Sequence, residues 1–396
     1  HLTGEARALR AFFYIKLAFI YGNVPLITKT LTIEESRNLT QSSADAIWDF
    51  IYSELNQAAN ELPTVSTEKG RITKGAALAL NARAMLFAKR YNEAASLAKS
   101  VMDLNVYSLV DSYASLFSYG GENNDEVILD KEFIKDVYSN NVMALFAPFS
   151  ILSNGVVMVP LKKIVDGYEM TNGKMIGESG SGFDPYDPYK NRDPRLYYSV
   201  YVPGDHLPDG RLFDSRPNSG LADAVGSNYQ VSVTGFYVKK YINKEDMNDL
   251  SNCGINIILL RYAEVLLTYA EAKVELNQID GSVYDAIDLI RGRSDVNMPL
   301  ITRDKSQEEL REIVRHERMV ELAFEGQRFF DIRRWNIAPE VFNVLIQGLT
   351  YVNNNGQLET VDQPGNIRRF EERDYLWPIP QKEMDLNKSL NQNPGW

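Results

Sequence analysis

The sequence is poor in the residues that build covalent cross-links and metal centres. Its 396 residues include one cysteine, Cys253, and three histidines, His1, His206 and His316. A single cysteine excludes an intrachain disulfide and any site made of several thiolates. Three scattered histidines make a poly-His centre equally unexpected. We therefore predict no bound metal and no cofactor.

Acidic residues outnumber basic residues in this sequence. The chain has 42 Lys+Arg against 53 Asp+Glu, which gives a net charge of −11 and a pI near 5.0. Nucleic-acid binding needs clustered Lys and Arg on the phosphates, so we expect no nucleic-acid partner. Long apolar runs are missing too: no stretch of 18 residues is apolar and uncharged, and we expect no membrane-spanning helix.

Helical periodicity is what the sequence has in abundance. Apolar residues recur every three to four positions in several stretches, and many of these end at Gly or Pro. One stretch opens with a capping box at Ser306 and Glu309. The predicted helices cover residues 4–21, 44–62, 73–90, 93–104, 256–277, 282–294, 306–325 and 327–335.

The predicted helices come in pairs. Residues 73–104 form a hairpin dense in alanine, which lets antiparallel helices approach closely, and residues 256–294 form another. The spacing between pairs is not constant. The sequence therefore predicts a mainly α fold, a tetratricopeptide-type scaffold of helical pairs interrupted by a large insertion.

The insertion, residues 111–250, has a different composition. It holds eight of the 16 prolines, and short alternating or apolar runs predict isolated strands at 126–129, 156–159, 197–201 and 236–241. Long ordered loops of this kind usually carry function. We expect a single body with helical pairs in 1–110, a loop-rich ligand-binding insertion in 111–250, further helical pairs in 251–335 and a loop-rich tail in 336–396 that packs on the scaffold.

Two segments match part of an enzyme motif but lack a residue that the motif requires. His316 and Glu317 start like the helix of a zinc protease, but Val320 stands where the second histidine belongs. Residues 167–174 resemble a phosphate-binding loop that is one residue too long, and Met175 replaces the magnesium-binding hydroxyl. Neither motif supports catalysis.

Glu317, Glu321 and Glu325 lie four residues apart on one predicted helix face. A glycosidase carboxylate pair is one interpretation, but catalytic carboxylates should flank a sugar from opposite sides. We favour a structural ion network, because like charges at this spacing repel unless cations neutralise them. The expected cations are Arg318, Arg328, Arg333 and Arg334.

Four segments together resemble the SusD/RagB family. They are GEARALRAFFYIKLAFIYGNVPLI at 4–27, RYAEVLLTYAEAKVELN at 261–277, ERMVELAFEGQRFFDIRRW at 317–335 and LWPIPQKEMDLNKSLNQNPGW at 376–396. Shorter echoes at 165–174 and 191–195 lie between them. All of these segments follow the family's order along nearly the whole chain.

The resemblance implies a fold and a function. Members have about four tetratricopeptide units and no enzymatic activity. They are lipid-anchored on the extracellular face of the outer membrane, where they capture oligosaccharides or peptides and pass them to a SusC-like TonB-dependent transporter. The lipobox cysteine and the segment before residue 4 that members carry are not in this sequence, so we expect membrane contact only through an anchor that this chain lacks.

The ligand site should lie outside the family segments, because these mark scaffold. All four tryptophans are then more consistent with packing. Sugar binding needs flat aromatic faces beside hydroxyl-binding polar groups, and two loops of the insertion combine them. The predicted ligand-binding residues are Tyr138, Asn140, Asn141, Phe146 and Phe149 in the first loop, and Tyr186, Tyr189 and Asn191 in the second.

Other functions stay open at this point. The same kind of lid could capture peptides, for which an elongated cleft with charged ends would be expected. The helical repeats could also serve only as a docking scaffold for proteins. A glycosidase rests on the glutamate stripe alone.

Overall fold

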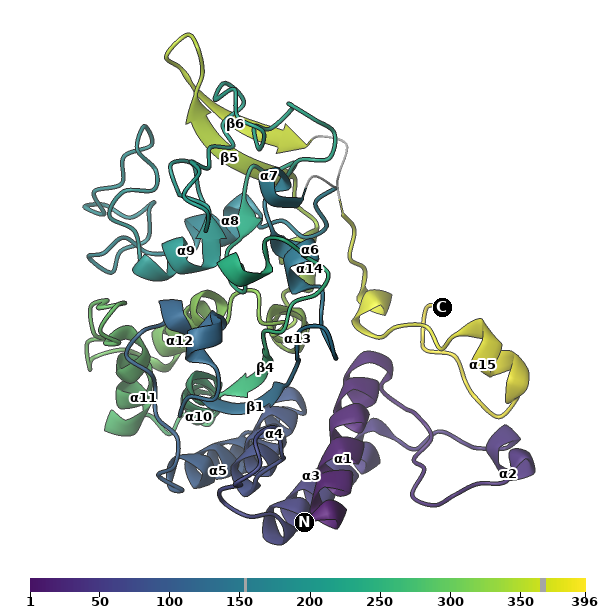
Figure 1. Cartoon of the computed structure of the whole chain (residues 1–396). Helices are drawn as coiled ribbons and strands as arrows, with labels where there is room; N and C mark the ends of the chain where they lie inside the picture. The colour runs from purple at the N-terminus through teal and green to yellow at the C-terminus, as the bar shows by residue number, and fades with distance from the viewer. Residues whose placement is uncertain (153–154, 364–367) are drawn as a thin grey trace.

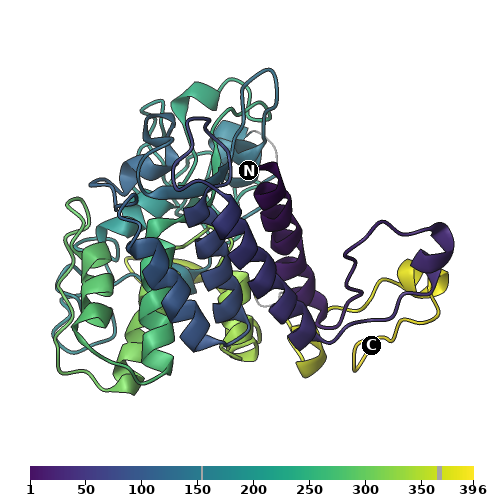
Figure 2. The same cartoon turned by 90° about the horizontal axis from the view of Figure 1, so that it is seen from below.

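The computed structural model describes residues 1–152, 155–363 and 368–396. The protein is mainly helical, as predicted, and its helices form a row at one end of the molecule, below an irregular lobe (Figures 1 and 2). The long helices of the row are α1 (Leu2–Tyr21), α3 (Ala44–Glu61), α4 (Lys74–Phe87), α5 (Tyr91–Met102), α10 (Tyr262–Glu275), α11 (Gly281–Arg291) and α12 (Gln307–Glu321). The short α13 (Arg328–Arg334) follows α12.

The helices begin where the sequence signals predict. Ser43 and Thr73 each accept a hydrogen bond from a backbone N–H in the first turn of α3 and α4. Ser306 and Glu309 form the predicted capping box at the start of α12. Every residue of α4 except Lys74 is buried, and its alanines let the neighbouring helices pack closely on all sides.

The row is continuous although the chain leaves it. The pairs α1–α3, α4–α5 and α10–α11 pack in that order, and α10 packs directly against α5 and α12. The whole insertion lies between α5 and α10 in the sequence. The helices before the insertion and those after it thus share one hydrophobic core.

Two strand predictions and one helix prediction need correction. Residues 257–261 belong to strand β4 (Ile257–Arg261), paired with β1 (Val127–Lys131), and the helix starts only at Tyr262. Ile257 and Ile258 are β-branched and favour the strand. Residues 197–199 are helical, because Asp193 caps α9 (Pro194–Ser199), and residues 156–159 form no strand.

The insertion forms a lobe with several small cores. Its elements are α6 (Val142–Phe146), α7 (Phe149–Leu152), α8 (Lys162–Asp166) and the paired strands β2 (Val200–Tyr201) and β3 (Tyr237–Val238), with the 3₁₀ turns η1 (Ala114–Phe117), η2 (Tyr119–Gly121) and η3 (Lys244–Asp246). A hairpin from the predicted loop-rich tail completes this lobe: β5 (Ile346–Val352) and β6 (Leu358–Gln363). The Leu349 amide of β5 donates to Thr234 O at 2.8 Å.

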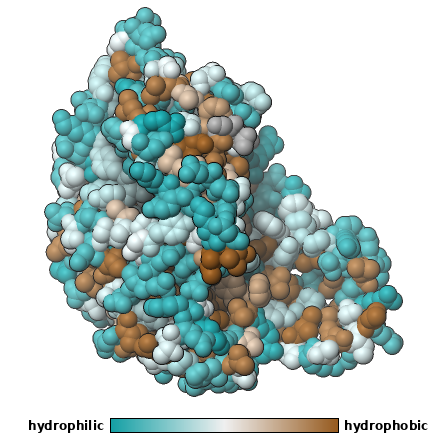
Figure 3. All heavy atoms as spheres, in the orientation of Figure 1, coloured by the Kyte–Doolittle hydropathy of each residue, from teal (hydrophilic) through white to brown (hydrophobic). Residues whose placement is uncertain are grey.

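The chain also forms an arm beside the helical row (Figures 1 and 2). It joins the loop around α2 (Ile33–Arg37) to the C-terminal segment with α15 (Gln381–Leu386). Asn387 Nδ2 donates to Leu39 O at 2.8 Å, and Asn393 Nδ2 donates to Tyr21 O at 3.0 Å. Apolar residues gather around the hollow between the arm and the main body (Figure 3). Of the remaining elements, α14 (Ala338–Phe342) lies between α13 and β5, and η4 (Glu372–Tyr375) lies between the hairpin and α15.

Among the helices within the described residues, none offers a stretch apolar and long enough to cross a membrane.

Candidate ligand-binding site

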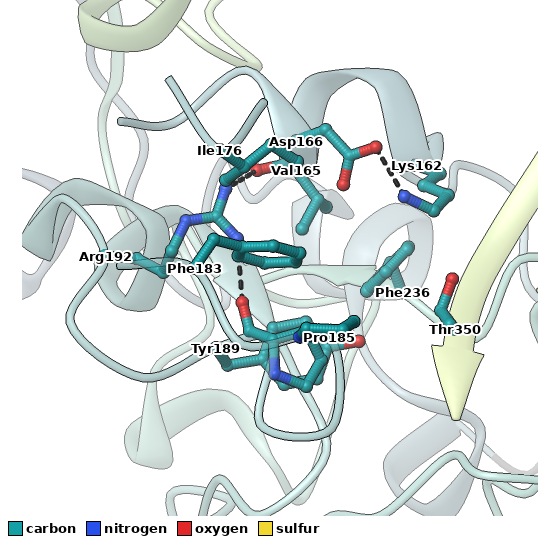
Figure 4. A pocket seen from close by; sticks show the side chains of 11 residues that line it. Lys162, Val165, Asp166, Ile176, Phe183, Pro185, Tyr189, Arg192, Phe236 and Thr350 are labelled. Atoms are coloured by element: carbon teal, nitrogen blue, oxygen red, sulfur yellow. Dashed lines mark hydrogen bonds and ion pairs between the residues drawn. The ribbon is translucent and has the colours of Figure 1, made fainter. Parts of the chain in front are cut away.

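A pocket of about 100 Å³ lies in the lobe, between α8, the loop 176–192 and strand β5 (Figure 4). We refer to it as the loop pocket. The residues that line it are Lys162, Val165, Asp166, Ile176, Phe183, Pro185, Pro188, Tyr189, Arg192, Phe236 and Thr350. Five of them come from the second predicted loop or follow it directly.

Aromatic and proline rings dominate the walls. Phe183, Pro185, Tyr189 and Phe236 surround the cavity (Figure 4). Tyr189 meets Phe236 edge to face, with ring centroids 6.3 Å apart. Burial raises the pKa of the Tyr189 phenol well above its usual value, so the hydroxyl stays protonated and available as a donor.

Arg192 fixes the loop that carries these rings. Its Nη1 donates to Pro188 O at 2.8 Å, and its Nη2 donates to Val165 O at 2.8 Å and Tyr168 O at 2.7 Å. The guanidinium carbon also lies 5.8 Å from the Phe183 ring centroid. One buried side chain therefore joins the aromatic loop to the end of α8.

Polar groups stand at the edge of the loop pocket. Lys162 and Asp166 form an ion pair one turn apart on α8, and Thr350 faces them from β5 (Figure 4). Lys162 retains donors and Asp166 retains acceptors beyond this pair. Flat apolar walls complement the apolar face of a sugar ring, and the polar groups beside them can bind its hydroxyls.

The three predicted residues of the second loop lie in different surroundings. Tyr189 lines the loop pocket, while Tyr186 lies nearby in sequence with 61% of its surface exposed. Asn191 is exposed and adopts a left-handed backbone conformation, φ 56°, which asparagine tolerates better than most residues. Its role fits the turn before Arg192 as well as contact with a ligand.

The first loop contributes nothing to the loop pocket. Tyr138 is 57% exposed and stacks on Phe133, with ring centroids 5.3 Å apart. Asn141 is exposed and Phe149 is half-buried. The structure thus places the two predicted loops at separate sites.

Two first-loop residues serve the fold. Phe146 is buried in the core cluster that includes Met143 and Cys253, so it presents no free ring face. Asn140 Nδ2 donates to Ile255 O at 2.8 Å, and its backbone pairs with Cys253.

Sequence reasoning missed several lining residues of the loop pocket. Lys162 and Asp166 belong to a helix only one turn long, and Phe236 was assigned to a strand. Thr350 arrives from a hairpin predicted as loop. The helical i,i+4 spacing of Lys162 and Asp166 was the one signal available for this pair.

The glutamate stripe is structural. Glu317, Glu321 and Glu325 are buried or nearly so, and each meets at least two cations. Burial alone would raise the pKa of Glu321, but Arg261, Arg293 and Arg195 outweigh it and lower that pKa below its usual value. Carboxylates committed in this way are unsuited to general acid catalysis.

The cations are not the ones predicted. Glu317 pairs with Arg195 and Arg291, and Glu325 pairs with Arg261 and Lys240. The four predicted arginines all lie close to the glutamates in the sequence. Of these, Arg318 and Arg334 bind Asp331 instead, at 3.2 and 2.6 Å, while Arg328 and Arg333 form no ion pair within the described residues.

The four tryptophans differ in burial, from Trp48 in the core to the two exposed tryptophans of the arm. Trp48 packs in the helical core, and Trp335 Nε1 donates to Glu271 Oε1 at 2.6 Å. Trp377 and Trp396, in the arm, keep 44% and 45% of their surface exposed. Both are thus more accessible than their assignment to packing predicted.

Comparison with protein families resolves what kind of protein carries this pocket. A family model described as the SusD family matches residues 125–396, more than half of the chain. The chain belongs to the SusD family. A second model, described as starch-binding associating with outer membrane, matches residues 1–86. The resemblance found in the sequence is thereby confirmed.

Relatives agree with this assignment. A SusD-like protein of Formosa agariphila is 28% identical over 370 residues, which are 88% of this chain and 68% of the relative. A crystal structure of a SusD-like carbohydrate binding protein from Bacteroides fragilis is 33% identical. It matches with a TM-score of 0.89 over 98% of this chain and 79% of that one.

A more distant structure shares the fold. A laminarin-binding SusD-like protein is 22% identical, with a TM-score of 0.69 over 100% of this chain and 79% of that one. The tetratricopeptide-like scaffold with a large insertion is therefore the SusD fold.

Proposed function

We propose that this SusD-like protein binds oligosaccharides through its insertion and passes them to a SusC-like TonB-dependent transporter. The observation that carries the proposal is the match to the Bacteroides fragilis carbohydrate binding protein, at 33% identity and over 98% of this chain. The loop pocket is the site that we propose for this binding.

The walls of the loop pocket are chemically suited to sugars. A pyranose has one apolar face, which can lie on Phe183 or Tyr189, while its hydroxyls reach the Lys162–Asp166 pair. Stacking that removes about 60 Å² of apolar surface from water contributes about 1.5 kcal/mol at 25 cal/mol per Å². One such contact changes affinity roughly tenfold.

The lobe and the helical pairs have different roles in this proposal. We infer that the lobe from residues 111–250 captures the ligand and that the helical pairs on either side hold it in place. The C-terminal hairpin joins the lobe through β5, so part of the tail would act with the insertion.

The cellular setting is part of the same proposal. Association with the outer membrane is the description of the family model over residues 1–86. We infer a lipid anchor, a position on the extracellular face, and a role as a lid over the transporter. Binding without hydrolysis is expected, because the buried glutamates are fully engaged with cations.

A binding experiment tests the proposal. The purified chain is screened on a glycan array, and the best ligand is titrated by calorimetry into the parent and a Phe183→Ala variant. Tyr229→Ala, which removes a 92% exposed ring that does not line the loop pocket, is the control. We expect Phe183→Ala alone to weaken binding about tenfold.

Two outcomes would contradict the proposal. Absence of any glycan binding, with binding to extended peptides instead, would favour the peptide lid. Equal affinity of the parent and Phe183→Ala would remove the loop pocket from the site.

A further inference from the structure

We propose that a second pocket, whose lining shares no residue with the loop pocket, binds one uncharged sugar ring of the same glycan. This inference rests on the proposed function for the class of ligand. We call this site the Tyr201 pocket. It holds about 250 Å³ and lies between η1, the α9–β2 junction and the segment that follows β3.

A tyrosine hydroxyl that has no partner in the protein and borders the cavity is the first observation. Tyr201 lines the pocket, and only 1% of its surface is exposed. Its hydroxyl forms no hydrogen bond with any described residue, and its oxygen is not among the fully buried atoms that lack a partner, so water in the cavity can reach it. A sugar hydroxyl that enters the cavity can take the place of this water.

The walls are the second observation. Phe117, Tyr198 and Tyr241 line the same cavity and give it aromatic surface from three separate segments. Ser118 and Asn243 add a hydroxyl and an amide. Aromatic surface beside small neutral polar groups complements the alternating apolar and hydroxylated faces of a pyranose.

The charges decide which sugar fits. Lys239 and Lys240 line the pocket, but each already has a carboxylate: Lys239 Nζ lies 3.1 Å from Asp205 Oδ2, and Lys240 Nζ lies 2.7 Å from Glu325 Oε1. A uronic acid or sulfated sugar would have to compete with these carboxylates for the cations. The Tyr201 pocket therefore favours a neutral ring.

The volume decides how much of the glycan enters. Pockets that hold drug-sized ligands enclose about 300–1,000 Å³, and this cavity of about 250 Å³ lies below that range. We therefore assign a single ring of the glycan to this space. The remaining rings of the glycan would lie outside the pocket.

Two variants test the site without touching the loop pocket. Tyr201→Phe removes only the hydroxyl. Ala114→Trp places a large side chain at an exposed position on the pocket wall. The probes are neutral hexasaccharides of β-glucan, xylan and galactan, with the hexasaccharide of polygalacturonate as the acidic probe, all measured by calorimetry.

We expect one neutral hexasaccharide to bind the parent, with about fivefold weaker binding to Tyr201→Phe and at least tenfold weaker binding to Ala114→Trp. Melting temperatures confirm that both variants are folded. If Ala114→Trp fails to fold, Tyr201→Phe alone decides.

The failures are distinguishable. Parent-like affinity of the folded variants, with weakened binding by Phe183→Ala, would overturn the Tyr201 pocket and leave the proposed function intact. Binding of the acidic probe alone would overturn the choice of a neutral ring. Absence of binding to every probe and to a full glycan array would overturn the proposed function itself.

Discussion

Arg195 Nη1 lies 2.9 Å from Glu321 Oε2, and both side chains are completely buried. Arg195 belongs to α9 in the insertion, and Glu321 ends α12 of the helical row. The same glutamate also meets Arg261 and Arg293, at 2.7 and 3.0 Å. A single carboxylate thus connects the insertion lobe to the helical row.

Removing the charge of Glu321 should therefore destabilise the whole molecule. Glu321→Gln leaves three buried arginines short of a carboxylate, and we expect a loss of about 3–5 kcal/mol in the free energy of unfolding. Urea denaturation measures it. Glu308→Gln, exposed on the same helix, is the control. A hydrolytic activity lost by Glu321→Gln at unchanged melting temperature would contradict a structural role.

The same network predicts acid sensitivity. Burial opposes ionisation of Glu317, Glu321 and Glu325, but the surrounding cations prevail and hold each pKa below its ordinary value near 4.5. The unfolded chain then binds more protons than the folded one below about pH 4.5. The stability from these groups is complete above that pH and is lost as the pH falls toward the folded-state values. Urea midpoints from pH 7 to 3 should show this fall, and a flat profile would argue against it.

Arg192 should act as a positioning residue for the loop pocket. Arg192→Met removes its hydrogen bonds to Val165, Tyr168 and Pro188, so we expect faster amide exchange in residues 183–191 and several-fold weaker glycan binding. Lys190→Met, an exposed neighbour, is the matched control. Unchanged exchange in the loop would show that other contacts hold it.

The exposed tyrosines of the two predicted loops can be compared directly. Tyr138→Ala and Tyr186→Ala each remove a ring that is more than half exposed. We expect roughly tenfold weaker binding where the ring stacks on sugar. Calorimetry with one oligosaccharide ranks the loops, and parent-like binding by both variants would exclude both tyrosines.

Cys253 should be dispensable for binding. It is completely buried, and burial raises the pKa of its thiol to about 11, so little reactive thiolate forms. Its Sγ donates to Leu250 O at 3.4 Å, a contact that serine can reproduce. We expect Cys253→Ser to cost about 1 kcal/mol of stability and to leave affinity unchanged. A redox-dependent affinity in the parent would count against this.

The helical scaffold could be predicted from the sequence because its signals are local. Ser43 and Thr73 cap helices whose apolar stripes repeat every three to four residues. The error at Ile257–Arg261 has the same origin, since a continuous apolar run reads as helix until its partner strand, 127–131, is known.

The loop pocket could be predicted only in part, because its members come from distant segments. Tyr189 sits in an aromatic loop that composition already marked. Phe236 and Thr350 reach the same cavity through strand pairings that no local pattern reveals. The cations around Glu317 were misassigned for the same reason, since Arg195 is 122 residues away in the sequence.

The direct contact between α5 and α10 has a consequence for synthesis of the chain. Roughly 160 residues separate the end of α5 at Met102 from the start of α10 at Tyr262. At about 5–20 residues per second, a ribosome needs roughly 8–32 s to make them. During that interval the α10-facing side of α5 lacks its native partner, and exposed apolar surface of this kind is prone to aggregation.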